Sequence, residues 1–507
     1  MIVSGAFTGK RYAVLGLARS GLSTVETLLA SGAYVTAWDN REEARMQVEA
    51  KDHPLAELAD PLTIDLAGFD GVVVSPGVPI NRHPIADAAR AAGVPLIGDI
   101  ELFAQARPSL PPHRVVAITG TNGKSTTTAL VHHICRSAAL PVRMGGNIGL
   151  PVLGQEPLPA GGVYVLELSS YQIDLTHSLA ADIAVLINLS PDHLDRYNGF
   201  EGYMASKARL FAMQEAGQHA VFGCGDANTL NVARDYAAAR GVEQVHVVDP
   251  GKLTGQAGWP SLQGPHNLQN AAIAVEIAGL LGLSEAQWRP ALTSFKGLAH
   301  RMERIGEHEG VLFVNDSKAT NPASTAPALA AYPRIHWIVG GLPKGDDLDD
   351  CLPHLSHVAA AYTIGEAGPR FAQILEPLVP VTRSEMLGDA VRQAMAVAQP
   401  GGLPKGDDLD ECLPHIGHVA AAYTIGEAGS RFADILEPLV PVSRSEMLCD
   451  AVRQAMAAAQ PGDVVMLSPA CASFDQFRDF EARGDAFRDI VAALVAERAT
   501  APGSSAS

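Results

Sequence analysis

The segment AITGTNGKSTTTALV, residues 117–131, carries the clearest chemical signal in this chain. An apolar run leads into a turn that contains Gly120 and Gly123, and Lys124 and Ser125 follow at the expected start of a helix. Backbone N–H groups of such a turn form an anion site at the helix N-terminus. A lysine there reaches the outer phosphates of a nucleotide, and a serine hydroxyl suits Mg²⁺. The segment predicts a nucleotide-phosphate site, although Ile118 stands where the common phosphate-binding loop has its first glycine.

A second glycine turn, VLGLARSG, begins at Val14 and resembles a dinucleotide-binding fingerprint with Ala18 in place of the middle glycine. Asp39 follows about twenty residues later, at the end of the next expected strand, where a ribose hydroxyl would bind. The turn has two interpretations: it binds a nucleotide, or it only packs a helix on a strand. A nicotinamide-dependent oxidoreductase would use this turn, but it would leave GTNGKST unexplained.

Polar residues also follow two other expected strands. Glu167 lies in LELSSYQ, and Asp192 and His193 lie in NLSPDHLDRY. Parallel sheets present their active sites at the carboxyl ends of strands, so these residues suit a Mg²⁺–phosphate site. A capping or core role explains each one equally well. Lys207, in YMASKARLF, lies in an expected helix, where a lysine is ordinarily solvated.

Further polar clusters occur where expected strands meet helices. They lie in GPHNLQNAA, GLAHRME, VNDSKATNPAST and LSPACASFDQF with the residues after it. N-caps would explain many of them one at a time. Together, they favour an active site built from several strand ends. The residues singled out are Asn267, Asn270, His300, Arg301, Asp316, Lys318, Thr320, Asn321, Ser473 and Phe480.

Composition excludes several functional classes. The formal net charge is −18, which argues against a broad nucleic-acid or anionic-membrane surface. No apolar run approaches the ~20 residues of a membrane helix, and the N-terminus shows no signal-peptide pattern. Six cysteines are scattered without a Cys-x-x-Cys pair, as in a reduced protein. We therefore expect a cytoplasmic protein without nucleic-acid partners or membrane insertion.

Apolar runs alternate with helical segments along most of the chain, which predicts an α/β fold with mainly parallel sheets. We expect three domains: residues 1–112, 113–298 and 299–507. The first and last are expected to be Rossmann-like, and the central one resembles a P-loop ATPase. Strands are expected at Arg11–Leu15, Tyr34–Trp38, Gly71–Val74, Val115–Thr119, Val311–Asn315, Ile335–Gly340 and Val464–Ser468.

The third domain contains a tandem duplication. Residues 341–401 align without gaps onto residues 402–462, with 8 differing positions. Two copies are too few for a repeat solenoid, which needs about three units to bury a continuous core. Each copy contains the turn GLPKGDD, with Lys344 in the first and Lys405 in the second. Because Lys344 directly follows the expected strand RIHWIVGG, we expect the first copy to supply the functional lysine and one copy to be surplus.

The motifs GTNGKST, LELSSYQ, NDSKATNP and LSPACASFDQF together resemble those of the Mur ligase family, over essentially the whole chain. GTNGKST alone is shared with folylpolyglutamate synthases, whereas the combination is typical of the members that add D-glutamate. The resemblance implies a monomeric, ATP- and Mg²⁺-dependent ligase. It would join D-glutamate to UDP-N-acetylmuramoyl-L-alanine through an acyl phosphate, during peptidoglycan precursor synthesis.

The resemblance also implies a role for each matching residue. ATP binding falls to Gly120, Thr121, Asn122, Gly123, Lys124, Ser125, Thr126, Asn267, Asn270, Arg301 and Asp316. Magnesium falls to Ser125, Glu167, His193 and Lys207, with Lys207 carbamylated as in the family; Lys124, His193 and Lys207 are the expected catalytic residues. The UDP-sugar falls to Arg19, Ser20, Asp39, Arg41, Gly77 and Asn147. D-glutamate falls to Thr320, Lys344, Ser473 and Phe480. A non-catalytic or impaired nucleotide-binding paralogue is the alternative that the duplication raises.

Overall fold

The structure is a computed structural model, and it describes most of the chain. The described residues are 1–192, 194, 196–197, 199–308, 310–342, 348–364, 367–383, 422–424, 442–444, 464–470, 473 and 477–500. The chain divides into two compact units. The first comprises Met1–Leu262 and His266–Phe295, and the second comprises Gln263–Pro265 and Lys296–Ser507. Within the described residues, no helix has the length and apolar character needed to cross a bilayer.

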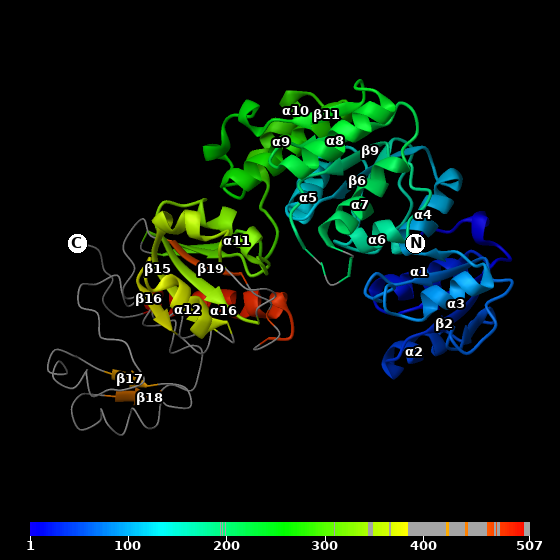
Figure 1. The fold of residues 1–507 in the computed structure, drawn as a ribbon, viewed down its shortest axis with the longest axis horizontal. Helices are drawn as coiled ribbons and strands as arrows, with labels where there is room; N and C mark the ends of the chain where they lie inside the picture. The colour runs from blue at the N-terminus through cyan, green and yellow to red at the C-terminus, as the bar shows by residue number, and fades with distance from the viewer. Residues whose placement is uncertain are drawn as a thin grey trace. The chain divides into compact units, whose positions relative to one another are not determined.

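The first unit contains two parallel sheets, and the N-terminal one is the smaller (Figure 1). All four residues of its strand β4 are buried, as expected for a sheet covered on both faces. In spatial order its strands are β3 (Ala56–Leu58), β2 (Tyr34–Trp38), β1 (Arg11–Leu15), β4 (Gly71–Val74) and β5 (Leu96–Ile97). The helices are α1 (Arg19–Ala30), α2 (Glu42–Glu49), α3 (Ile85–Ala92) and α4 (Asp99–Ala106), with 3₁₀ turns η1 (Gly5–Phe7) and η2 (Arg107–Ser109).

The second parallel sheet has six strands and positions the phosphate-type motif. In spatial order they are β11 (Val245–Val248), β10 (His219–Gly223), β9 (Ile183–Leu186), β6 (His113–Thr119), β8 (Gly162–Glu167) and β7 (Val142–Gly146). The helices are α5 (Lys124–Ser137), α6 (Ser170–Asp174), α7 (Gly199–Ala212), α8 (Ala227–Arg240), α9 (Pro265–Leu280) and α10 (Glu285–Ser294). Short 3₁₀ turns are η3 (Val152–Gly154), η4 (Pro250–Lys252) and η5 (Gln256–Gly258). Central strand β6 pairs with β8 on one side and β9 on the other, so their carboxyl ends meet at one edge.

A single apolar cluster joins the two sheets of the first unit. Phe103 on α4 packs edge to face on Tyr164 of β8, with ring centroids 5.0 Å apart. The backbone N–H of Ile2 and the hydroxyl of Thr27 both donate to the carbonyl of Leu153. Buried apolar contacts of this kind are the main source of stability at such a junction. The predicted boundaries at residues 112 and 298 remain a proposal.

The second unit contains a six-stranded mixed sheet. Strands β12 and β13 are antiparallel, and the other neighbours are parallel. In spatial order they are β12 (Glu303–His308), β13 (Val311–Asn315), β19 (Val464–Ala470), β14 (Ile335–Gly340), β15 (Val358–Ile364) and β16 (Val381–Arg383). The helices are α11 (Pro322–Leu329), α12 (Gly368–Leu375) and α16 (Phe480–Thr500), with the 3₁₀ turn η6 (Leu352–His357). The α/β fold with mainly parallel sheets, predicted from the sequence, is thus confirmed.

The two copies of the duplicated segment contribute to different sheets. Strands β15 and β16 of the first copy extend the main sheet next to β14. The equivalent strands of the second copy, β17 (Ala422–Thr424) and β18 (Val442–Arg444), pair with each other in a separate two-stranded parallel sheet. Both lysines of the repeated turn, Lys344 and Lys405, lie outside the described residues. The first copy is therefore the one that joins the main sheet.

Candidate active site

The predicted phosphate loop connects β6 to α5 through two glycines with positive φ, Gly120 at +152° and Gly123 at +84°. A Cβ on Gly123 would overlap Oδ1 of Asn270, so any side chain there would require that amide to move. Lys124 is the first residue of α5, and its Nζ donates to the carbonyls of Gly120 (2.9 Å) and Thr121 (2.7 Å). The lysine therefore lies over its own loop, where its charge adds to the positive end of the helix dipole.

Asn188, which follows β9, holds this loop in place. Its Oδ1 accepts the N–H groups of Thr121 (3.1 Å) and Asn122 (2.8 Å), and its Nδ2 donates to the carbonyl of Asn122 (3.1 Å). Thr121 is fixed a second time, because its hydroxyl donates to the carbonyl of Ser190 (3.1 Å). Three contacts from one amide side chain specify the backbone conformation that the phosphate site requires.

Lys207 on α7 is 1% exposed and lies beneath the loop. Its Nζ donates to the carbonyl of Gly120 (2.8 Å) and lies 4.6 Å from the ring centroid of Tyr203. Burial lowers its pKa well below the ordinary value, and the positive charge of Lys124 lowers it further. The carboxylates of Asp192 and Glu167 act in the opposite direction. Lys207 is therefore not the solvated lysine that a helix ordinarily carries, because α7 packs it against the loop.

Glu167 ends β8 and is also 1% exposed. Its Oε1 accepts a hydrogen bond from Nδ2 of Asn147 (3.0 Å), whereas Oε2 is buried and has no partner among the described residues. A buried carboxylate oxygen without a donor is costly, and a hard cation is the usual way to satisfy it. Ser125, buried at the start of α5, adds a hydroxyl oxygen of the type Mg²⁺ accepts. These donors fit a magnesium ion. His193 lies outside the described residues. Among the residues that are described, no group of three or more His, Cys, Asp or Glu side chains is placed to hold a metal ion.

A cavity of about 430 Å³ lies beside Glu167, between residues that follow β1, β2, β4 and β7. Asp39 is held there by the N–H groups of Leu17 (2.7 Å) and Arg41 (2.9 Å). Burial alone would raise the pKa of Asp39, but the hydrogen bonds from Arg41 and Leu17 lower it on balance. The cavity's lining includes all six residues matched to a UDP-sugar: Arg19, Ser20, Asp39, Arg41, Gly77 and Asn147.

The second unit carries its own cluster at the carboxyl ends of β13 and β19. Asp316 accepts hydrogen bonds from the N–H of Met302 (3.0 Å) and the hydroxyl of Ser468 (3.0 Å). Burial raises the pKa of Asp316 to about 7, against the charge of Arg301. Phe480 lies at the start of α16, and Nζ of Lys318 is 3.7 Å from its ring centroid. The structure thus brings Arg301, Asp316 and Phe480 to one end of this sheet. Ser473, which precedes Phe480 in the sequence, is also buried.

Comparison with known proteins assigns the family. Three family models match in chain order: the Mur ligase MurD-like N-terminal domain over residues 10–98, the Mur ligase middle domain over 118–252, and the Mur ligase glutamate ligase domain over 300–404. A relative from Novosphingobium aromaticivorans is 68% identical over 498 residues, which cover 98% of each chain. A relative from Sphingopyxis alaskensis is 53% identical, with 97% of this chain and 100% of the relative covered. A third, from Zymomonas mobilis, is 50% identical. All three are named UDP-N-acetylmuramoylalanine–D-glutamate ligase.

The chain belongs to the Mur ligase family. As a Mur ligase it is an ATP-dependent ligase of peptidoglycan synthesis, and the oxidoreductase alternative is not favoured.

The structure places most of the residues expected from the Mur ligase motifs. In the first unit, Gly120–Thr126, Glu167, Lys207, Asn267 and Asn270 converge on the carboxyl edge of the second sheet. Helix α9 begins at Pro265, so Asn267 and Asn270 lie within its first two turns. Asn270 Oδ1 accepts from the hydroxyl of Thr127 (3.2 Å). Arg301, Asp316, Thr320, Ser473 and Phe480 lie in the other unit, and Lys344 lies outside the described residues.

Two residues of this Mur ligase site were missed in the sequence. Asn188 opens the quoted motif NLSPDHLDRY, yet only Asp192 and His193 were selected from it. Gln172, in LELSSYQ, lines the cavity with the UDP-sugar residues and also completes the capping box of α6. The signal available for Asn188 was its place two residues after a buried strand, and for Gln172 its place in the first turn of the helix that follows β8; both places also suit ordinary capping roles.

Proposed function

We propose that this chain joins D-glutamate to UDP-N-acetylmuramoyl-L-alanine in the cytoplasm, with hydrolysis of ATP and as a monomer. The observation that carries the proposal is the cavity beside Glu167. The six residues matched to a UDP-sugar through the family resemblance line it, although they are spread from residue 19 to residue 147. Asn147 belongs to this lining and also donates to Glu167.

The chain's own residues have defined tasks in this proposal. Gly120–Thr126 bind the ATP phosphates, and Lys124 neutralises charge at the γ-phosphate. Asn267, Asn270, Arg301 and Asp316 are the further residues proposed to contact the nucleotide. Ser125, Glu167, His193 and Lys207 would hold Mg²⁺, which supplies charge neutralisation between phosphate oxygens when bound. The unsatisfied Oε2 of Glu167 supports this assignment.

The chemistry follows from the reactants. A carboxylate is a poor electrophile, so the alanyl carboxylate first attacks the γ-phosphorus of ATP and ADP leaves. The resulting acyl phosphate is attacked by the amine of D-glutamate, which loses a proton as inorganic phosphate departs. Positioning and charge neutralisation account for such a reaction without a side-chain nucleophile. Thr320, Lys344, Ser473 and Phe480 are proposed to bind D-glutamate.

An impaired paralogue is a second candidate, because a specific observation raises it. Strands β17 and β18 of the second repeat copy form a sheet separate from the main one. Within the described residues, each of these two strands has one edge without a neighbouring strand, and such edges favour misassembly. Against this candidate, the first copy completes the main sheet with β15 and β16.

Release of inorganic phosphate from ATP by the purified full-length chain tests the proposal. We expect release only when Mg²⁺, UDP-N-acetylmuramoyl-L-alanine and D-glutamate are all present, together with formation of the dipeptide product. L-glutamate in place of D-glutamate is the matched control. Nucleotide binding without turnover would instead support the impaired paralogue, and turnover with a different amino acid would overturn the proposed substrate.

A further inference from the structure

Arg196 connects the two sheets of the first unit at the rim of the UDP-sugar cavity. Its guanidinium donates to the carbonyl of Val78 (3.0 Å) and to that of Pro76 (3.4 Å), in the loop that follows β4. Gly77 lies between these two acceptors and lines the UDP-sugar cavity, as Pro76 and Val78 themselves do. A ligand that packs against Gly77 therefore contacts the same short loop that Arg196 holds from the other side.

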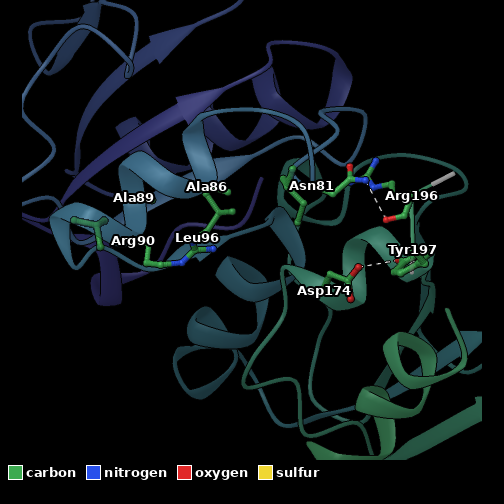
Figure 2. Close-up of a pocket in the computed structure, with 10 residues that line it drawn as sticks. Asn81, Ala86, Ala89, Arg90, Leu96, Asp174, Arg196 and Tyr197 are labelled. Atoms are coloured by element: carbon green, nitrogen blue, oxygen red, sulfur yellow. Dashed lines mark hydrogen bonds between the residues drawn. The ribbon is translucent and has the colours of Figure 1, made fainter. Parts of the chain in front are cut away.

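Arg196 is fixed by more than its guanidinium. Its backbone carbonyl accepts a hydrogen bond from Nδ2 of Asn81 (3.1 Å), as Figure 2 shows. Its guanidinium carbon lies 3.5 Å from the ring centroid of Tyr171, two positions after the cap of α6. Cation–π stacking adds to the hydrogen bonds, and a planar guanidinium can make both at once. A cavity of about 500 Å³, lined by Arg196, Asn81 and Arg90, borders this contact (Figure 2).

The neighbouring residue continues the connection towards the phosphate loop. Tyr197 donates its hydroxyl to Asp174 on α6 (2.8 Å; Figure 2), and its ring packs edge to face on Tyr203 of α7, with centroids 5.7 Å apart. Tyr203 in turn donates to the hydroxyl of Thr121 in the phosphate loop (3.3 Å). A chain of direct contacts thus runs from the loop around Gly77, through Arg196 and Tyr197, to Thr121.

We propose that Arg196 is a positioning residue that couples occupancy of the UDP-sugar cavity to nucleotide binding at the phosphate loop. The inference rests on the proposed function and deepens it. A sugar nucleotide against Gly77 restricts the carbonyls that Arg196 contacts, and Arg196 passes this restriction to Tyr197 and Tyr203. Linkage then requires that each ligand strengthen binding of the other by the same factor. The enzyme would thereby favour ATP when the carboxylate that accepts its phosphate is in place.

The contact at Leu153 serves as an internal comparison. Ile2 and Thr27 also join the two sheets there, through the Leu153 carbonyl. None of these three residues lines the UDP-sugar cavity. That junction explains why the two sheets form one unit without Arg196, so removal of the Arg196 side chain is expected to change coupling more than folding.

The test is a binding cycle on the full-length chain. Dissociation constants for UDP-N-acetylmuramoyl-L-alanine are measured by calorimetry without and with the non-hydrolysable β,γ-imido analogue of ATP and Mg²⁺. In the unmodified chain we expect the analogue to tighten sugar-nucleotide binding by about 5-fold or more. In Arg196→Ala the ratio of the dissociation constants without and with the analogue should fall below about 2-fold. Arg196→Lys keeps the charge and a single donor group, so its ratio should lie between those of the unmodified chain and Arg196→Ala.

Arg90→Ala is the matched control. Arg90 lines the same cavity as Arg196, but the ion pair found for its side chain is with Asp87 on the same helix, and that pair is exposed. This variant should keep the full coupling ratio. Tyr203→Phe, which removes the hydroxyl that donates to Thr121, should lower the ratio at the other end of the same chain of contacts and covers the case in which Arg196→Ala fails to fold.

The outcomes separate this inference from the proposed function. Equal weakening of sugar-nucleotide binding with and without the analogue in Arg196→Ala would assign Arg196 a purely structural role and overturn the inference. An unmodified chain with normal ligase turnover but no coupling would overturn it as well. Absence of D-glutamate-dependent turnover in the unmodified chain would instead overturn the proposed function.

Discussion

The amine of Lys207 lies 2.8 Å from the carbonyl oxygen of Gly120, so a buried lysine supports the phosphate loop from below. Lysine is rarely buried to this degree without a compensating anion. Burial and the nearby Lys124 lower the pKa of Lys207 well below its ordinary value, which raises the share of neutral amine at neutral pH. The neutral amine is the form that attacks CO₂ to give a carbamate, with loss of one proton.

We expect Lys207→Ala to be inactive in phosphate release and to recover part of its activity when a short carboxylate such as formate or acetate is added. The added carboxylate would replace the anionic oxygen that a carbamate normally supplies to magnesium. Lys124→Ala serves as the control, because its lost group is a cation and carboxylates should not rescue it. An unmodified Lys207 in an active, bicarbonate-saturated sample, observed by ¹³C NMR with labelled bicarbonate, would contradict the carbamate.

Lys124→Ala should lower the turnover number by at least about 10²-fold, the usual cost of removing one group that stabilises developing charge. The fold should survive, since each hydrogen bond from Nζ to the carbonyls of Gly120 and Thr121 is worth about 1 kcal/mol. Steady-state phosphate release and a thermal melt check both parts. Lys252→Ala, at an exposed position in η4, should leave both unchanged. Near-normal turnover in Lys124→Ala would be inconsistent with the assigned phosphate loop.

Gly123→Ala tests the conformation of the loop. A non-glycine residue in the left-handed region costs roughly 1–2 kcal/mol, and here the new methyl group would also meet Oδ1 of Asn270. We expect weaker ATP binding, measured by calorimetry, together with a lower melting temperature. Gly161→Ala separates the cost of the left-handed backbone from the contact with Asn270, because φ at Gly161 is +82° and no atom lies within 4 Å of the added Cβ. An equal loss of melting temperature in both variants would mean that the contact with Asn270 plays no part.

Asp316 makes the stability of the chain depend on pH. Its pKa is about 7 in the folded state, against 3.8 for the unconstrained group, because its carboxyl group is buried. The folded state therefore holds the proton more tightly, and the contribution is favourable below about pH 4 and is lost as the pH rises towards 7. Asp316→Asn should remove this dependence, so its melting temperature should gain on the unmodified chain between pH 4 and pH 7. A constant difference over that range would argue against the raised pKa.

The duplicated segment gives a prediction about which copy acts. Lys344→Ala should lose activity, because its turn follows β14, whereas Lys405→Ala should retain it. Deletion of residues 402–462 removes β17 and β18 but leaves every strand of the main sheet. We therefore expect the shortened chain to stay folded and active in phosphate release. Loss of activity only in Lys405→Ala would reverse the choice of copy, and an inactive parent rescued by the deletion would identify the duplication as disabling.

Much of the architecture was determined by the sequence alone. The ends of β1, β2, β4, β13 and β14 match the ranges expected from apolar runs, because a strand buried on both faces must be continuously apolar and stops at glycine or polar residues. The phosphate loop was equally accessible, since the Gly120 and Gly123 turn with Lys124 is a local pattern along consecutive residues. Local sequence thus set the elements and the chemistry placed at their ends.

Tertiary structure decided what depends on distant partners. A helical lysine is solvated or buried according to what packs on it, and only the packing of α7 under the loop placed Lys207 at 1% exposure. Asn188 acquires its role because β9 lies next to β6, which brings its amide to Asn122, 66 residues away in sequence. The two repeat copies have nearly the same sequence and therefore nearly the same strand propensity. Chain connectivity is what differs between them: the first copy directly follows β14, so β15 pairs with that strand and β17 does not.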